Sequence, residues 1–94
     1  MDIKVSELRS VINHLLDYVE QETGSTINVE RDAYWFVSND AVYDPYAESP
    51  KLTMGQLSDD WQNLKGILDK KDNTVGYALV WASTLLRAVG DQVP

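Results

Sequence analysis

Residues 75–89, VGYALVWASTLLRAV, decide the fold. Apolar residues recur there at the three- and four-residue steps of a helix. One face consists of Val75, Ala78, Leu79, Ala82, Leu85, Leu86 and Val89. Further apolar residues lie off this face, among them Tyr77, Val80, Trp81 and Ala88. A helix that is apolar around most of its circumference is typically buried on more than one side.

This pattern gives the helix two candidate roles. It lies at the centre of the fold, or it supplies a homodimer interface with Trp81 or Val80 near the seam. We expect a cap at Asn73 or Thr74 to begin the helix, and Gly90 to end it.

Residues 53–68 predict a preceding helix. Thr53 and Gln56 match a capping box, and Leu52 and Leu57 match the hydrophobic staple that often accompanies it. The apolar residues then alternate steps of three and four, which is typical of a helix that packs on another helix. This seam comprises Met54, Leu57, Trp61, Leu64 and Leu68. The adjacent Asp59 and Asp60 point about 100° apart on a helix, and we expect both to be solvated.

A third helix is predicted over residues 6–22, with Ser6 as its N-cap and Gly24 as its stop. Its apolar stripe comprises Val5, Leu8, Val11, Ile12, Leu15, Leu16 and Val19. Residues 26–29 and 34–37 are rich in β-branched and aromatic side chains and predict a hairpin around residues 30–33. A short helical turn is expected over 40–43.

The fold class is therefore mainly α, with α+β as the alternative, and residues 1–94 are expected to form a single domain. Three principal helices make up the fold, and a small hairpin or extended aromatic segment lies between the first two. The expected core consists of Trp61, Leu64, Leu79, Leu85 and Leu86.

Composition excludes several functions. Fifteen Asp and Glu residues against eight Lys and Arg give a net charge of −7, so the chain lacks the clustered positive charge of a nucleic-acid-binding surface. It has no cysteine and one histidine, which excludes disulfides, thiolate metal sites and multi-histidine sites. We expect no metal and no cofactor. No apolar run reaches the length of a membrane span, so we expect no membrane partner and a cytoplasmic location.

Catalytic signatures are also missing from the sequence. Neither a G-x-G-x-x-G loop, a G-K-[ST] motif nor a G-x-S-x-G elbow occurs. His14 has no neighbouring orienting group or nucleophile, and we expect it at the surface. No catalytic residue is predicted.

The candidate binding site lies in residues 34–48, which hold five of the nine aromatic residues. Between residues 32 and 48 there are four carboxylates and neither a lysine nor an arginine. Aromatic side chains beside carboxylates are suited to a basic protein partner, because the rings anchor the contact and the charges steer the encounter. The predicted contact residues are Asp40, Tyr43, Asp44, Tyr46 and Glu48. The alternative is a core strand followed by a loop that Tyr43 and Tyr46 pin in place.

Five strings are spread over most of the chain: YW at 34–35, DPY at 44–46, LTMGQL at 52–57, DW at 60–61 and YALVW at 77–81. On these strings the chain resembles a family of small, uncharacterised bacterial proteins. The resemblance implies a bacterial origin and a compact helical domain, without an assigned chemistry.

The leading functional hypothesis is a non-catalytic acidic module, immunity-like or adaptor-like, that binds a basic protein. One alternative is a small hydrolase-type enzyme that uses Asp and Tyr residues of segment 34–48. Another is a homodimeric structural subunit of an assembly.

Overall fold

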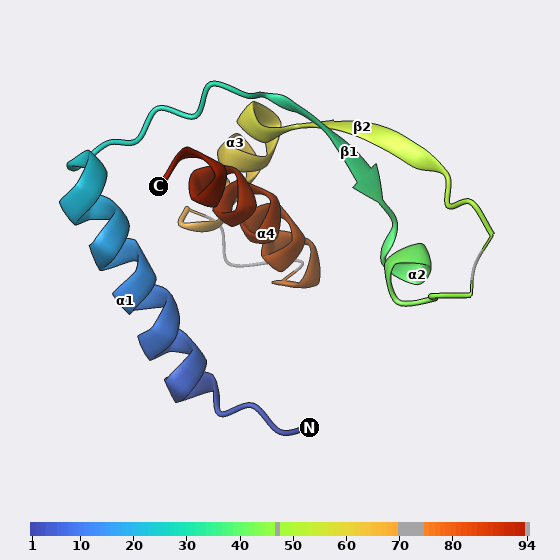
Figure 1. Ribbon diagram of the computed structural model, residues 1–94, viewed down its shortest axis with the longest axis horizontal. Helices are drawn as coiled ribbons and strands as arrows, with labels where there is room; N and C mark the ends of the chain where they lie inside the picture. Colours follow the sequence, from blue (N-terminus) through green and yellow to red (C-terminus); the bar gives the residue numbers. More distant parts are fainter. Residues whose placement is uncertain (47, 70–74, 94) are drawn as a thin grey trace.

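A computed structural model describes residues 1–46, 48–69 and 75–93 (Figure 1). In chain order the elements are α1 (Val5–Thr23), β1 (Ala33–Val37), α2 (Asn39–Val42), β2 (Leu52–Gln56), α3 (Leu57–Ile67) and α4 (Val75–Gln92). The protein is mainly helical with a small two-stranded antiparallel sheet, which confirms the predicted fold class. Across the described ranges, none of the helices combines the length and apolar character needed to cross a membrane.

The sheet pairs β1 with β2, so the predicted hairpin between residues 26–29 and 34–37 is wrong. Residues 26–29 belong instead to an irregular connection between α1 and β1. Tyr34 lies opposite Gly55 and Phe36 lies opposite Thr53, whereas Trp35 lies opposite Met54 on the other face. Strand propensity alone does not choose a partner, because sheet pairing depends on cross-strand packing. Here Gly55 leaves space for the ring of Tyr34.

The predicted capping box is also wrong, because Thr53 lies within β2 and α3 begins only at Leu57. The cap comes from Asp32, which immediately precedes β1. The backbone N–H of Leu57 donates to the carbonyl oxygen of Asp32 at 2.8 Å, and the N–H of Ser58 donates to its Oδ1 at 2.8 Å. Pairing of the strands thus brings Asp32, which is distant in sequence, to the first turn of α3, where its oxygens accept hydrogen bonds from N–H groups that have no partner within the helix.

α3 and α4 pack closely on each other, and the predicted core is only partly correct. Leu64 and Leu85 are half-buried, but Trp61, Leu79 and Leu86 are exposed. The inward face of α3 is rotated from the predicted seam. It comprises Leu57, Asp60, Leu64 and Ile67.

α1 and α4 begin and end close to the predicted positions, with two corrections at their ends. Ser6 lies inside α1, whose N-cap is Lys4, whereas Gly24 ends the helix with a positive φ of 88°. α4 continues through Gly90 to Gln92, so the predicted stop at Gly90 is wrong. The predicted cap at Asn73 or Thr74 lies outside the described residues. The expected turn at 40–43 is present as α2, where the hydroxyl of Ser38 accepts from the N–H of Ala41.

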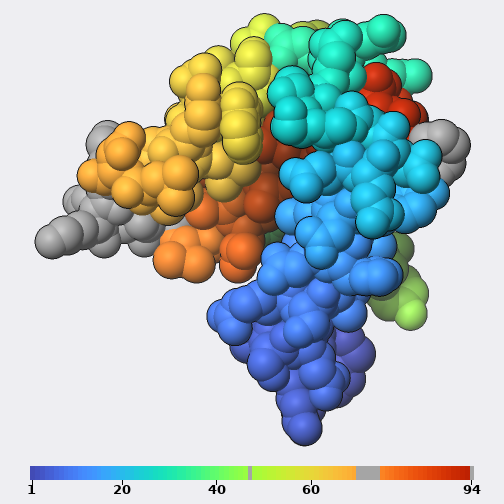
Figure 2. Space-filling model, turned by 90° about the vertical axis from the view of Figure 1, so that its left-hand side faces the viewer, coloured from blue at the N-terminus to red at the C-terminus, as the bar shows by residue number. Residues whose placement is uncertain are grey.

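α1 stands apart from the other elements. In Figure 1 it lies to one side of α4, and residues 24–32 run as an extended connection from its end to β1. Figure 2 shows the N-terminal half of α1 extending beyond the rest of the molecule. Much of its apolar stripe is therefore exposed, including Leu8, Val11, Leu15 and Leu16.

Candidate functional site

The acidic aromatic segment, defined here as the described residues 40–46 and 48, connects α2 to the approach of β2. Tyr43 caps the C-terminus of α2 and is 82% exposed, and Tyr46 is 93% exposed. Neither ring pins the segment to a core, as the alternative interpretation would require. Both tyrosines therefore present nearly their whole side chains to solvent.

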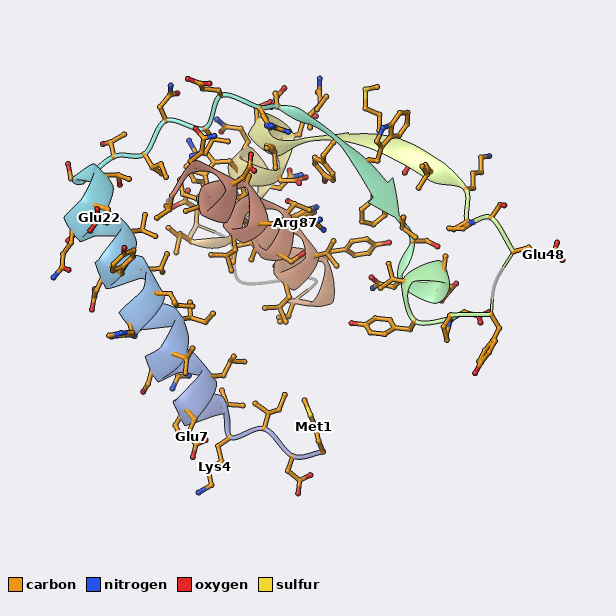
Figure 3. The ribbon with its side chains drawn as sticks, viewed as in Figure 1. Met1, Lys4, Glu7, Glu22, Glu48 and Arg87 are labelled. Atoms are coloured by element: carbon orange, nitrogen blue, oxygen red, sulfur yellow. The ribbon has the colours of Figure 1, made fainter. Side chains whose placement is uncertain are left out.

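The carboxylates of this segment are exposed as well. Asp40 lies in the first turn of α2, and Glu48 lies at the outer edge of the connection (Figure 3). The Oδ1 of Asp44 accepts a hydrogen bond of 3.1 Å from the backbone N–H of Tyr46. This short turn holds the Asp44 carboxylate against the backbone of Tyr46.

The ion pairs of the described residues lie elsewhere. Lys4 approaches Glu7 at 4.0 Å, and the Nε of Arg31 approaches the Oδ2 of Asp91 at 3.2 Å. Neither pair neutralises Asp40, Asp44 or Glu48. The segment therefore keeps its negative charge available to a partner.

A second polar feature, the Asp60 cluster, joins three elements and was not predicted. Asp60 is 6% exposed, so the expectation that it is solvated is wrong. Its Oδ2 accepts one hydrogen bond from the Tyr34 hydroxyl and another from the Thr84 hydroxyl, each at 2.6 Å. The cluster thereby connects β1, α3 and α4. The sequence signal was the spacing of Leu57, Asp60, Leu64 and Ile67, which places Asp60 on an apolar face.

The chemistry of this cluster favours a packing role. Burial, followed by the hydrogen bond to Asp60 and the negative charge of Asp60, raises the pKa of Tyr34 from 10.0 to about 12. The phenol therefore keeps its proton near neutral pH and acts as a donor. A general base or nucleophile must instead be readily deprotonated at the working pH. The Thr84 hydroxyl also lies 2.9 Å from the carbonyl oxygen of Trp81, which further fixes its position.

An open groove of about 1230 Å³ lies between the β1–α2 connection and α4. We call it the α4 groove. One wall includes Tyr34, Phe36, Val42 and Tyr43, and the α4 wall includes Leu79, Val80, Ser83 and Arg87. Its volume exceeds the roughly 300–1,000 Å³ of sites for small ligands. It is thus better matched to a segment of polypeptide.

No group of three potential metal ligands comes together within the described part of the chain. His14 is exposed on α1. A scan against protein-family models finds no matching family, and searches of curated proteins and of solved structures find no match either.

Proposed function

We propose that this chain is a non-catalytic protein-binding module of the bacterial cytoplasm that recognises a basic protein through its acidic aromatic segment. The observation that carries the proposal is the exposure of Tyr43 and Tyr46 beside the carboxylates of Asp40, Asp44 and Glu48. An immunity-like or adaptor-like role fits this chemistry, because both classes act by covering a surface of another protein.

The two kinds of side chain have separate tasks. Exposed tyrosines offer large contact area at low conformational cost and are enriched among the residues that dominate binding energy. Carboxylates accelerate the encounter with a positively charged surface. Pro45 within the segment and Pro50 shortly after it restrict the backbone, which reduces the entropy lost when a partner orders the segment.

Site-specific photo-crosslinking tests the proposal in the native host. Tyr46 is replaced by the photoreactive p-benzoylphenylalanine, which keeps an aromatic side chain at the site. The matched control carries the same residue in place of Trp61, an exposed aromatic on α3. We expect position 46, and not position 61, to capture a protein with more Lys and Arg than Asp and Glu.

Association rates measured with the captured protein then distinguish electrostatic steering by this segment from the effect of the net charge of the chain. The variant Asp40→Asn, Asp44→Asn, Glu48→Gln should slow association, and the effect should be larger at low salt. The control Glu22→Gln, Asp59→Asn, Asp69→Asn removes the same charge from exposed positions elsewhere. Equal association rates for the two variants, an acidic captured protein, or identical capture from positions 46 and 61 would contradict the proposal.

A further inference from the structure

α1 carries an apolar stripe that the described part of its own chain does not cover. Leu15 in the middle of the helix is 53% exposed, and Leu8, Val11 and Leu16 are also exposed. The opposite face is polar, with Arg9, Asn13 and Asp17. A helix with one apolar face normally buries it against another element.

The α4 groove offers a surface of matching kind. Leu79 on its α4 wall is 65% exposed, and Val42 on the other wall is 55% exposed. A helix about 10 Å across occupies about 120 Å³ per residue. The groove of about 1230 Å³ thus has room for about ten residues, or nearly three turns.

The surface area shows how much contact is missing. The chain exposes 8162 Å², whereas a folded monomer of this mass exposes about 5,500 Å². The radius of gyration is 15.0 Å, against about 12 Å for a compact domain of this length. The excess of about 2,700 Å² per chain is about 5,400 Å² for a pair of chains, which lies at the upper end of the range of about 2,000–5,000 Å² and more that obligate dimers bury.

We propose that the α4 groove receives α1 of a second copy of this chain, and that the second copy receives α1 of the first in return. Such a reciprocal exchange uses the same two surfaces on both copies and closes as a two-fold dimer. The extended residues 24–32 already hold α1 away from its own body. The proposal keeps α4 in the homodimer interface and assigns α1 as the element that it binds.

The charge of Arg87 on the α4 wall also favours α1 as the element that occupies the groove. Arg87 lines the groove, and the ion pairs of the described residues do not include it. α1 carries the carboxylates of Glu7, Glu20 and Glu22 on the flanks of its apolar stripe. Because each copy has a net charge of −7, added salt should strengthen the dimer by screening the repulsion between copies. Salt would weaken binding to a basic partner, so the two associations are distinguishable.

The first experiment measures the mass of the full chain by sedimentation equilibrium over a range of protein and salt concentrations. We expect twice the chain mass of 10.6 kDa, with the dimer favoured by added salt. Leu15→Asp should shift the mass to that of a monomer, because it places a charge in the apolar stripe. Asn13→Asp adds the same charge to the polar face of α1 and should leave the dimer intact. A parent that is monomeric throughout, or a dimer that Leu15→Asp leaves unchanged, would overturn the proposal.

The second experiment identifies the occupant of the groove by crosslinking. Because the chain contains no cysteine, the introduced cysteines are the only thiols present. A tagged Leu15→Cys chain and an untagged Leu79→Cys chain are refolded together and treated with a flexible bis-maleimide. We expect a crosslinked product that contains one chain of each kind, whereas Asp17→Cys with Leu79→Cys should give little. The double variant Leu15→Cys, Leu79→Cys distinguishes the remaining possibility. Crosslinking confined to one chain would show that α1 covers the groove of its own chain, and this would contradict the proposal. The absence of any crosslink between positions 15 and 79 would contradict it as well.

Discussion

The Tyr34 hydroxyl donates a hydrogen bond of 2.6 Å to the Oδ2 of Asp60, a residue 26 positions further along the chain. The same oxygen accepts from Thr84 at 2.6 Å. One buried carboxylate therefore connects the sheet to both helices of the packed pair. Few apolar side chains of the described residues are buried, so this polar connection helps to fix how β1 lies against α3 and α4.

Asp60→Ala should lower the free energy of unfolding by about 1–3 kcal/mol, because it removes the shared acceptor from two partly buried hydroxyls. The neighbouring Asp59 is exposed in the same helical turn and provides the control. Asp59→Ala should change the free energy by less than about 0.5 kcal/mol. Urea unfolding followed by circular dichroism, at one protein concentration, measures both. Equal losses from the two variants would contradict the assigned role of Asp60.

The Tyr34 hydrogen bond should also appear as a dependence of stability on pH. The pKa of Tyr34 is raised from 10.0 to about 12 in the folded protein. The associated stabilisation is therefore present below pH 10 and is lost as pH rises through about 12. Tyr34→Phe lacks this ionisation, so the parent should be more stable than the variant below pH 10, and the gap should narrow above it. Urea midpoints of both proteins across this range test the prediction, and a gap independent of pH would refute it.

Gly55 and Gly66 should respond to alanine with opposite signs. A Cβ at Gly55 would overlap the ring of Tyr34, whereas a Cβ at Gly66 in α3 meets open space. Gly55→Ala should cost about 1–3 kcal/mol through overpacking. Gly66→Ala should add about 0.5–1 kcal/mol, because alanine is the better helix former. Thermal unfolding compares them, and a neutral Gly55→Ala would show that Tyr34 moves aside at little cost.

Asp32→Ala should destabilise the protein by about 1 kcal/mol, because it removes the side-chain acceptor of the Ser58 N–H at the start of α3. Thr53→Val tests the cap expected from the sequence and keeps a β-branched residue in β2. It should have a smaller effect, because Thr53 is a strand residue. Urea unfolding decides between the two, and the opposite order would restore the capping box.

The long helices were predictable because their periodicity is local. The stripes of α1 and α4 extend over several turns, so each helix could be located from its own residues. The start of α3 was not predictable in this way, since residues 52–56 carry both a capping pattern and strand-forming residues. The choice between them depends on pairing with β1, a partner distant in sequence. Likewise, Leu79 and Leu86 match a core pattern, but their exposure depends on which surfaces meet.

The two candidate sites differ in the same way: the acidic aromatic segment is predictable from local sequence, whereas the Asp60 cluster depends on tertiary packing. Aromatic and acidic residues around prolines predicted the composition of the segment at 40–48, and the structure adds the exposure of both tyrosines. Apolar residues alone do not reveal Asp60, because the seam that they define places Trp61 on the inward face. A one-residue error rotates a helical face by about 100°. A stripe that includes one polar residue, Asp60, matches the inward face.

The cap of α3 by Asp32 makes the sheet and the helix a single cooperative unit. The N–H groups of Leu57 and Ser58 gain their acceptors only when the pairing of β1 with β2 has brought Asp32 to the start of α3. Opening the strands would therefore release these amides at the same time. In native-state hydrogen exchange, Leu57 and Ser58 should share their opening free energy with the paired amides of β1 and β2 rather than with the last turn of their own helix.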